Sequence, residues 1–288
     1  MYTRPQPSPL VLFLIAALSI AVLALVIIQP SEPASRLISR WSPQPMLTRP
    51  DLPAQQPNPP SPVPIAGVAV QVAGFDLSID PGLYPDQQDP LAGEIQQALA
   101  YVTQRFGSAP SGRFTVAVIQ EPSCGMHGLA YTDRRVVQVF TCTSIERRRA
   151  VAILAHEIVH QLSHDRYGPA HLSADLILSE GIATWGAGSY WLGDQADFRA
   201  FVRAQREAGQ FYPLATHYQG RGIAAMNALY YQWASFVDFL IATYGRERFD
   251  QLYISGSGAP GSANYQGVYG KPLDALEREW TDWLDTKF

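Results

Sequence analysis

Two histidines and a glutamate in this chain have the spacing of a metal site. His156 and His160 stand four residues apart in an H-E-x-x-H pattern, and Glu157 follows the first of them. In an α-helix, residues four apart project from one face, about 40° apart around the axis and about 6 Å apart along it. Two imidazoles placed in this way can bind one zinc ion, and the adjacent carboxylate can act as a general base. The motif therefore predicts a zinc site with Glu157 as the catalytic base.

A third ligand is needed, because a catalytic zinc ion usually takes three protein ligands and leaves a fourth position for water. Glu180 is the best candidate. It lies twenty residues after His160, which is room for the motif helix to end, a loop to turn and a second helix to begin. We expect a helix from Ser179 that holds Glu180 on its first turn, facing the motif helix, with Gly181 permitting close approach of helices.

Two further histidines compete for this role. His164 continues the same helical face, and His171 follows in the next loop. A histidine ligand of the H-E-x-x-H-x-x-G-x-x-H class would need glycine and histidine at positions 163 and 166, which hold serine and arginine. We therefore expect His164 and His171 to be surface residues.

The elements that must position these side chains follow from the apolar spacing. Strands are predicted at residues 68–72, 75–79 and 114–119, a hairpin at residues 129–131 and 136–141, and helices at residues 91–106, 179–190, 197–208, 225–244 and 273–285. The motif helix has Thr143 and Glu146 as a T-x-x-E capping box at its start, with Gly168 and Pro169 beyond its end. A strand-rich first half followed by a helical second half predicts an α+β domain.

The N-terminal region predicts a membrane attachment. Residues 10–28 are an uncharged apolar run, long enough to cross a membrane as a helix. We interpret residues 1–9 as a short tail, residues 10–28 as an uncleaved transmembrane signal anchor, and the proline-rich residues 29–64 as an extended linker before a domain at residues 65–288. A cleaved signal peptide, and therefore a secreted domain, is the alternative.

The cysteines indicate the compartment in which the protein works, and the net charge limits the kinds of molecule it is expected to bind. Cys124 and Cys142 are the only two cysteines, and they flank the predicted hairpin. In a domain outside the cytoplasm one disulfide between them is the natural interpretation, and two separately buried thiols are the alternative. The net charge is −4. Without a long basic stripe, nucleic acid is not an expected partner.

With Glu180 included, the chain resembles the gluzincin zinc metallopeptidases, whose signature is H-E-x-x-H followed by a glutamate some twenty residues on. The resemblance covers residues 91–288 and looks like the peptidase-MA-like branch in the stretches RFG, FTVAVI, SEGIATW, YYQWASFVDFLIATYG and GKPLDALEREWTDWL. It implies a zincin-like fold in which His156, His160 and Glu180 bind zinc. It also implies that Glu157 activates the attacking water, which agrees with zinc-assisted hydrolysis in general.

Tyr230 is the candidate donor to the oxyanion of the tetrahedral intermediate. Gluzincins commonly supply a tyrosine or histidine from a downstream helix for this purpose. Tyr230 lies on the apolar face of the predicted helix at residues 225–244, whereas Tyr231 points to another side. Plain packing in the core is the alternative for Tyr230.

Residues of the substrate site distinguish the aminopeptidases from the endopeptidases among the gluzincins. An extended peptide is expected to pair with an edge strand, for which residues 136–141 are the candidate. The aminopeptidase branch carries a Gly-x-Met-Glu-Asn motif whose glutamate binds the free amine of the substrate. Here His127 follows Met126, so that anchor is missing and an endopeptidase is favoured. A carboxylate usually orients a ligand histidine, and Asp175 is the candidate for that role here.

The leading hypothesis is a membrane-anchored, zinc-dependent metallopeptidase that acts on peptide or protein substrates outside the cytoplasm. The alternative is a catalytically silent binding or scaffold protein on a zincin fold, although the ligands and the base are all present. A structural exported domain with a chance motif is the third hypothesis, and it would hold no stoichiometric zinc.

Overall fold

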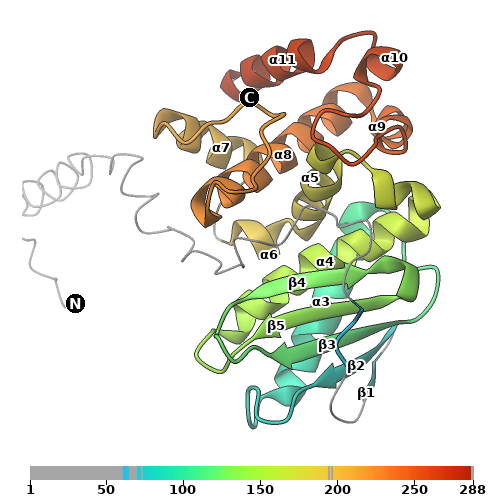
Figure 1. Cartoon of the computed structure of the whole chain (residues 1–288), viewed down its shortest axis with the longest axis vertical. Coiled ribbons are helices and arrows are strands. Elements are labelled where there is room, and N and C mark those ends of the chain that lie inside the picture. The colour runs from blue at the N-terminus through green and yellow to red at the C-terminus, as the bar shows by residue number, and fades with distance from the viewer. Residues whose placement is uncertain (1–60, 65–69, 73, 194, 196, 287–288) are drawn as a thin grey trace, which may run out of the picture. The chain divides into compact units, whose positions relative to one another are not determined.

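A five-stranded sheet forms the first half of the described chain (Figure 1). The computed structural model describes residues 61–64, 70–72, 74–193, 195 and 197–286, which belong to the compact unit Ser42–Phe288. The strands are β1 (Val70–Val72), β2 (Phe75–Ile79), β3 (Phe114–Gln120), β4 (His127–Tyr131) and β5 (Val136–Thr141), and their order in the sheet is β1-β2-β3-β5-β4. The three inner strands run parallel, and β1 and β4 are antiparallel at the two edges.

The edge strand of the sheet differs from our expectation. We expected residues 136–141 to form the edge, and this is wrong, because β5 lies between β3 and β4. A hairpin pattern fixes that two strands are neighbours but does not say which of them pairs with the rest of the sheet. The run VVQVFT is mostly apolar and almost entirely buried, with Gln138 as its one interior polar residue, which is typical of an inner parallel strand. The edge strand on this side of the sheet is therefore β4, next to β5.

Two helices lie side by side on one face of the sheet (Figure 1). They are α3 (Gln88–Phe106) and α4 (Arg147–Tyr167). The apolar spacing predicted α3, which buries Leu91, Ile95, Leu99, Val102 and Phe106 and ends at Gly107 in the left-handed conformation. On the other face of the sheet, Ala117, Ile119 and Phe140 form a smaller apolar cluster.

The start of α4 corrects one local prediction. Gly168 ends the helix as expected, but the capping box of Thr143 and Glu146 does not form. Glu146 itself occupies the N-cap position, without a side-chain capping hydrogen bond, so it cannot act as the third helical residue of such a box. Arg147 instead holds the first turn through an ion pair with Glu94 on α3, at 2.7 Å.

The second half of the chain is helical. Its helices are α5 (Leu176–Ala187), α6 (Ser189–Leu192), α7 (Phe198–Glu207), α8 (Ile223–Tyr244), α9 (Arg246–Tyr253), α10 (Tyr265–Tyr269) and α11 (Leu273–Asp285). The sequence predicted α7, α8 and α11 within two residues, and missed α9 and α10, which are too short for a clear apolar repeat. The α+β class predicted from the sequence is confirmed.

Two glycines let α5 pack closely against both of its neighbours. A β-carbon at Gly181 would lie 2.8 Å from the backbone oxygen of Trp233 on α8, and one at Gly186 would lie 2.7 Å from the Val159 side chain on α4. The close approach expected at Gly181 therefore exists, but it is made to α8 rather than to the motif helix. Because α5 lies between α4 and α8, side chains from all three helices can meet in one place.

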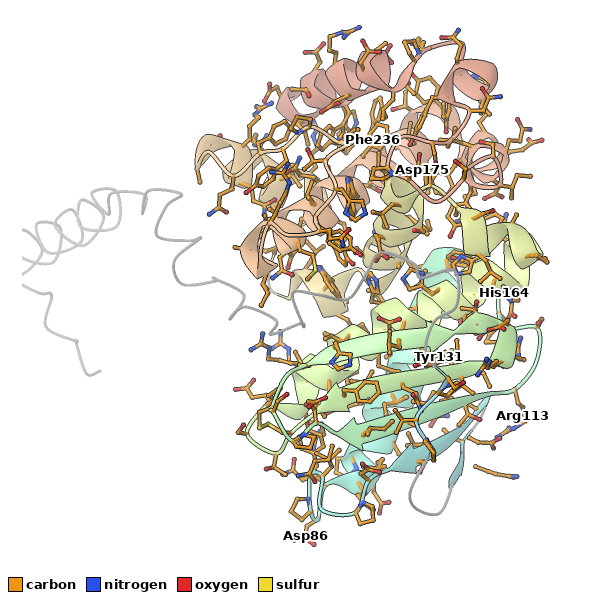
Figure 2. The ribbon with its side chains drawn as sticks, in the orientation of Figure 1. Asp86, Arg113, Tyr131, His164, Asp175 and Phe236 are labelled. Atoms are coloured by element: carbon orange, nitrogen blue, oxygen red, sulfur yellow. A yellow bond between two sulfur atoms is a disulfide. The ribbon has the colours of Figure 1, made fainter. Side chains whose placement is uncertain are left out.

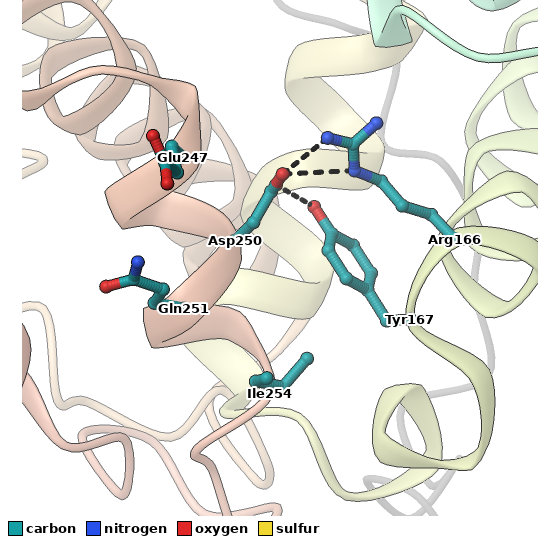
Figure 3. Close-up of a pocket in the computed structure, with 6 residues that line it drawn as sticks. All are labelled: Arg166, Tyr167, Glu247, Asp250, Gln251 and Ile254. Atoms are coloured by element: carbon teal, nitrogen blue, oxygen red, sulfur yellow. Dashed lines mark hydrogen bonds and ion pairs between the residues drawn. The ribbon is translucent and has the colours of Figure 1, made fainter.

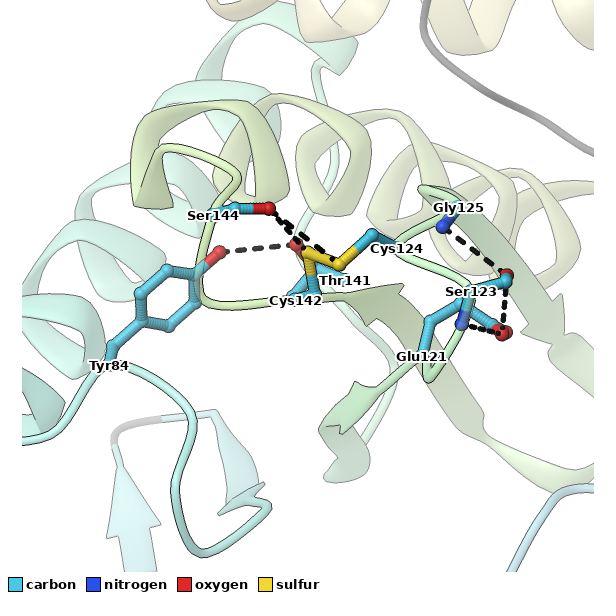
Figure 4. Close-up of a disulfide and its surroundings, with 8 residues drawn as sticks. All are labelled: Tyr84, Glu121, Ser123, Cys124, Gly125, Thr141, Cys142 and Ser144. Carbon is cyan, nitrogen blue, oxygen red and sulfur yellow. Dashed lines mark hydrogen bonds between the residues drawn. A yellow bond between two sulfur atoms is a disulfide. The ribbon is translucent and has the colours of Figure 1, made fainter.

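A disulfide joins the two ends of the β4–β5 hairpin (Figure 4). Cys124 precedes β4 and Cys142 follows β5, with their α-carbons 5.1 Å apart, so the predicted bridge is confirmed. Close by, the Tyr84 hydroxyl is 3.2 Å from the hydroxyl of Thr141 at the end of β5. The edge strand is thus fixed at the end where it enters the sheet.

The predicted tail, the membrane span at residues 10–28 and most of the linker lie outside the described residues. Within the part of the chain that the structure describes, no helix is both long and apolar enough to cross a membrane. The last residues of the predicted linker lie against the sheet. Val63 donates from its N–H to the Gln138 side-chain oxygen at 3.0 Å and accepts from the Gln138 amide nitrogen at 2.8 Å.

Candidate metal centre and active site

The side chains of His156, His160 and Glu180 meet between α4 and α5. The His156 Nε2 atom is 3.1 Å from Glu180 Oε2 and 3.2 Å from His160 Nε2. The distance from His160 Nε2 to Glu180 Oε2 is 3.7 Å. Among the described residues, this is the one group of three or more histidine, cysteine or acidic side chains whose donor atoms gather closely enough to hold a metal ion.

The donor set fits a zinc ion. With bonds of about 2.0–2.1 Å, the ligand atoms of a tetrahedral zinc site lie about 3.3 Å apart, close to the three distances above. Two imidazole Nε2 atoms also face each other at 3.2 Å, and such an arrangement is satisfied when both lone pairs point at one cation. The two nitrogens and one carboxylate oxygen are ligands that zinc commonly takes in catalytic sites.

Protonation of Glu180 and protonation of His160 are coupled in this site. Burial alone would raise the pKa of Glu180, but hydrogen bonds from His156 and His160 outweigh it and hold the pKa well below its usual range. Burial likewise opposes protonation of His160, but its hydrogen bond and proximity to Glu180 raise its pKa. The Glu180 side chain is therefore an anion in this site, ready to bind a cation.

Glu180 occupies a later helical position than we expected. The prediction placed it on the first turn of a helix from Ser179, but α5 begins at Leu176 and Glu180 lies on its second turn. The start is fixed by Asp175, whose carboxylate accepts a hydrogen bond from the Ile177 N–H at 2.9 Å. Aspartate is among the strongest N-cap residues, so a sequence analysis that gave more weight to Asp175 would have found the correct start.

Asp175 does not orient a ligand histidine, and that prediction is wrong. The residue lies in the helical half of the molecule (Figure 2). Besides capping α5, its carboxylate accepts hydrogen bonds from the Gly261 N–H, the Ala263 N–H and the Tyr265 hydroxyl, at 3.1, 2.9 and 3.0 Å. All its acceptor capacity is used in joining the start of α5 to a loop near the C-terminus.

Thr184 contacts the outer nitrogen of the first histidine instead. Its hydroxyl lies 3.3 Å from His156 Nδ1, and the residue is fully buried. A hydrogen bond at this nitrogen fixes the ring orientation and the tautomer of a metal ligand. Sequence reasoning missed Thr184 because it looked for a carboxylate, although Thr184 lies one helical turn after Glu180 and so on the same face of α5.

Glu157 lies against the edge strand. A β-carbon at Gly128 would come within 2.4 Å of the Glu157 Cγ atom, so only glycine fits at this position of β4. The backbone of Ala130 makes a hydrogen bond to the carboxyl group. Burial raises the pKa of Glu157, against the effect of His156 and His160. The carboxyl group therefore lies between the paired histidines and the strand at the edge of the sheet.

Tyr230 lies at the site, as the apolar face of its helix predicted. Its ring is stacked on that of His156, with centroids 5.7 Å apart and planes 4° apart. Burial and the nearby Glu180 carboxylate raise its pKa well above the usual value, so the phenol keeps its proton. Tyr218 shares a side-chain hydrogen bond with Tyr230. Tyr218 lies in the loop between α7 and α8, where sequence reasoning gave it no role.

Tyr231 points elsewhere, as expected, and donates from its hydroxyl to the Trp191 backbone oxygen.

The expectation that His171 lies on the surface is wrong. Its side chain is only 5 % exposed, its Nδ1 atom lies 2.9 Å from the Tyr253 hydroxyl, and burial lowers its pKa to about 3. The cause is η2 (Gly168–Ser173), a short 3₁₀ helix that turns the chain back under α4. His164 is partly buried.

A surface hollow of about 530 Å³ lies away from these residues, between the end of α4 and α9 (Figure 3). Asp250 lies at its centre and pairs with Arg166 and with the Tyr167 hydroxyl, the latter at 2.6 Å. Arg246 completes the network from the next turn of α9, at 2.8 Å. The ion pairs of Asp250 with Arg166 and Arg246 occupy the charged groups at its centre, and Glu247 also lines the hollow.

Comparison with solved structures finds zinc peptidases at low similarity. An M1 zinc metallopeptidase from Deinococcus radiodurans shares 20% sequence identity at a TM-score of 0.43, over 77% of this chain and 52% of that one. An aminopeptidase N family protein from Idiomarina loihiensis shares 12% identity at a TM-score of 0.41, over 75% of this chain and 40% of that one. The chain thus spans about half of these structures or less.

No protein-family model matches the sequence, and no curated protein matches it. With structural similarity at this level, the function has to be argued from the arrangement of His156, Glu157, His160, Glu180 and Tyr230.

Proposed function

We propose that the chain is a zinc-dependent metallopeptidase of the gluzincin type that cleaves peptide bonds. The observation that carries the proposal is the meeting of His156, His160 and Glu180 within tetrahedral ligand distances. A zinc ion held there would polarise a carbonyl group and lower the pKa of a water molecule towards 7. The remaining requirements are a base, an oxyanion donor and a means of holding a peptide, and for each we propose a residue or a strand.

Glu157 is the general base in this proposal. Its carboxyl group is next to both histidines, and burial raises its pKa towards the range in which a carboxylate can take a proton and return it. Tyr230 is the proposed oxyanion donor, because its raised pKa keeps the phenol protonated and able to donate. Its ring stacks on His156, which fixes it beside the metal ligands.

The strand β4 is the proposed place for the substrate. It forms an edge of the sheet, and an extended peptide can add to an edge strand through backbone hydrogen bonds. Gly128 and Ala130 of this strand contact the Glu157 carboxyl group, so a peptide paired with β4 would run past the proposed base.

We further propose an endopeptidase. The sequence of β4, HGLAY, contains no acidic residue to bind the free amine of a substrate. Where the aminopeptidase motif has its glutamate, this chain has His127, whose ring stacks on Phe140 with centroids 4.4 Å apart. A site without an amine anchor does not require the scissile bond to lie next to the N-terminus of the substrate.

The proposed location is outside the cytoplasm, with residues 10–28 as a membrane anchor. The apolar length of this segment supports the anchor, and the disulfide between Cys124 and Cys142 supports an oxidising compartment. Fractionation of the full chain, followed by protease treatment of intact cells, would test this directly. A full-length protein recovered in the soluble cytoplasmic fraction would contradict it.

The central test measures zinc and peptide cleavage together. The full chain should hold about one zinc ion and cleave a peptide library at internal bonds, whereas Glu180→Ala should lose both. Asp250→Asn, which changes a carboxylate away from the site, is the control and should keep both. Retention of zinc by Glu180→Ala would exclude Glu180 as a ligand. Stoichiometric zinc with no cleavage of any peptide would favour a binding protein over an enzyme.

A further inference from the structure

The buried tryptophans of the helical half differ in whether the indole N–H donates a hydrogen bond to the protein. Three of them donate from the indole N–H to a protein acceptor: Trp185 to the Asp238 carboxylate at 2.8 Å, Trp233 to the Leu214 backbone oxygen at 2.9 Å, and Trp280 to the Ser235 hydroxyl at 3.2 Å. Trp191 is only 8 % exposed, and its indole nitrogen is enclosed by the protein and has no hydrogen-bond partner among the described residues. Buried indole N–H groups usually find an acceptor, so Trp191 needs an explanation.

Trp191 lies beside the proposed zinc ligands. Its ring centroid is 4.9 Å from that of His156 and 6.2 Å from that of Tyr230. It belongs to the short helix α6, which packs against α4 (Figure 1). The hydroxyl of Tyr231 donates to the Trp191 backbone oxygen at 3.1 Å and so fixes the position of this residue.

The chemistry of indole limits what can pair with it. The indole nitrogen donates one hydrogen bond and accepts none, and it carries no charge. Its partner must therefore be an acceptor. Asp238, which is partly buried in the same half of the molecule, already accepts a hydrogen bond from Trp185. In a site that binds an extended peptide, the acceptors brought in by the ligand are its backbone carbonyl oxygens.

We propose that Trp191 donates a hydrogen bond from its indole nitrogen to a backbone carbonyl oxygen of the bound peptide. This assignment rests on the proposed peptidase function and names a second side chain, besides Tyr230, that contacts the substrate. It makes the helical half part of the substrate site, opposite the edge strand β4. A neutral donor at this place favours an uncharged peptide group over a free amine, which agrees with an endopeptidase.

Trp191→Phe and Trp185→Phe form a matched pair of variants in the zinc-loaded full chain. Each removes an indole N–H and leaves an aromatic ring. Trp191→Phe should lower kcat/KM for peptide cleavage about tenfold, because one hydrogen bond to substrate is lost, and should leave zinc affinity unchanged. Trp185→Phe deprives Asp238 of its donor, so it should lower Tm and leave kcat/KM of the folded enzyme unchanged.

Two results would overturn the assignment. One is an unchanged kcat/KM in Trp191→Phe. The other is a loss of activity that follows a loss of zinc affinity, because Trp191 would then act through its packing on His156. Either result leaves the peptidase proposal intact as long as the wild-type chain cleaves peptides.

A spectroscopic measurement separates the two proposals. Indole nitrogen-15 labelling of zinc-loaded Glu157→Gln gives one resonance per tryptophan, and the resonance absent from the double variant with Trp191→Phe belongs to Trp191. Addition of an intact substrate peptide should move this resonance downfield and leave that of Trp233 in place. An unmoved resonance at saturating peptide would overturn the role of Trp191. Failure of the wild type to cleave any peptide would overturn the peptidase, whatever the resonance does.

Discussion

The two sides of α4 present different residues of the proposed active site. On the side of the sheet, Glu157 packs against Gly128 of the edge strand. On the side of the helical half, His156 contacts Thr184 and stacks on Tyr230. Neighbouring residues of a helix point about 100° apart, so the step from histidine to glutamate in the motif directs one side chain to each half. The helical half contacts the proposed metal ligand His156, and the sheet contacts the proposed base Glu157 and contains the proposed substrate strand β4.

The largest expected effect comes from replacing the proposed base, Glu157. Glu157→Gln keeps the size of the side chain but removes its ability to take a proton, so kcat should fall by about 10²- to 10⁴-fold. Zinc content should stay the same, because the proposed ligands are on other residues. Metal analysis and peptide kinetics on one preparation check both statements. Full activity with zinc bound would show that the base has been misassigned.

Gly128→Ala tests the sheet side without replacing any of the proposed catalytic residues. The new methyl group would lie 2.4 Å from Glu157 Cγ, so the carboxyl group or the strand must shift. Displacements of about 1 Å in an active site cost about 100-fold in rate, and we expect a loss of that order in kcat with unchanged zinc affinity.

Gly186→Ala is the counterpart on the helical side. Its methyl group would press on Val159 of α4 at 2.7 Å, so it should weaken the packing of α4 against α5 and lower zinc affinity. If both glycine variants changed zinc affinity equally, the division between the two sides of α4 would be wrong.

Thr184→Val tests the helical side at the first histidine. Valine has nearly the shape of threonine but cannot hydrogen-bond His156 Nδ1, and loss of such an outer contact typically costs 10- to 100-fold in metal affinity, about 10-fold being expected for a neutral hydroxyl. Thr184→Ser should restore most of the affinity. Competition with a zinc chelator gives the measurement. Equal affinities for the valine and serine variants would mean that the hydroxyl does not orient the ring.

Removal of the disulfide should have the smallest effect on catalysis. Replacing both Cys124 and Cys142 by serine opens a loop of 18 residues, and bridges of that size typically contribute about 3 kcal/mol to the free energy of unfolding. We expect a lower Tm and faster hydrogen exchange in β4 and β5, with exchange in α8 unchanged. Zinc affinity should hardly change. A large loss of zinc would show that the hairpin also supports the metal ligands.

The sequence predicted those parts of the fold that depend on local periodicity. The α3 helix, the boundaries of α11 and the meeting of His156, His160 and Glu180 all follow from helical spacing and one loop length. That these three residues bind zinc stays a prediction.

What the sequence could not predict depends on packing between distant segments. Thr184 reaches His156 only because α5 lies against α4, and His171 is buried because η2 turns back under α4. Tyr218 reaches Tyr230 from a loop whose path no spacing rule describes. The exchange of β5 for β4 as the edge strand has the same origin, since the pairing partner of each strand is a long-range property.

The hydrogen bonds of Asp175 set a condition on how the protein is made. The helix that carries Glu180 begins at a buried carboxylate, and most of its partners, Gly261, Ala263 and Tyr265, lie more than eighty residues later in the chain. Until that loop has emerged from the ribosome, Asp175 cannot be buried without loss of most of its hydrogen bonds, which is costly for a carboxylate. We therefore expect a chain truncated before residue 261 to lack a stable arrangement of His156, His160 and Glu180.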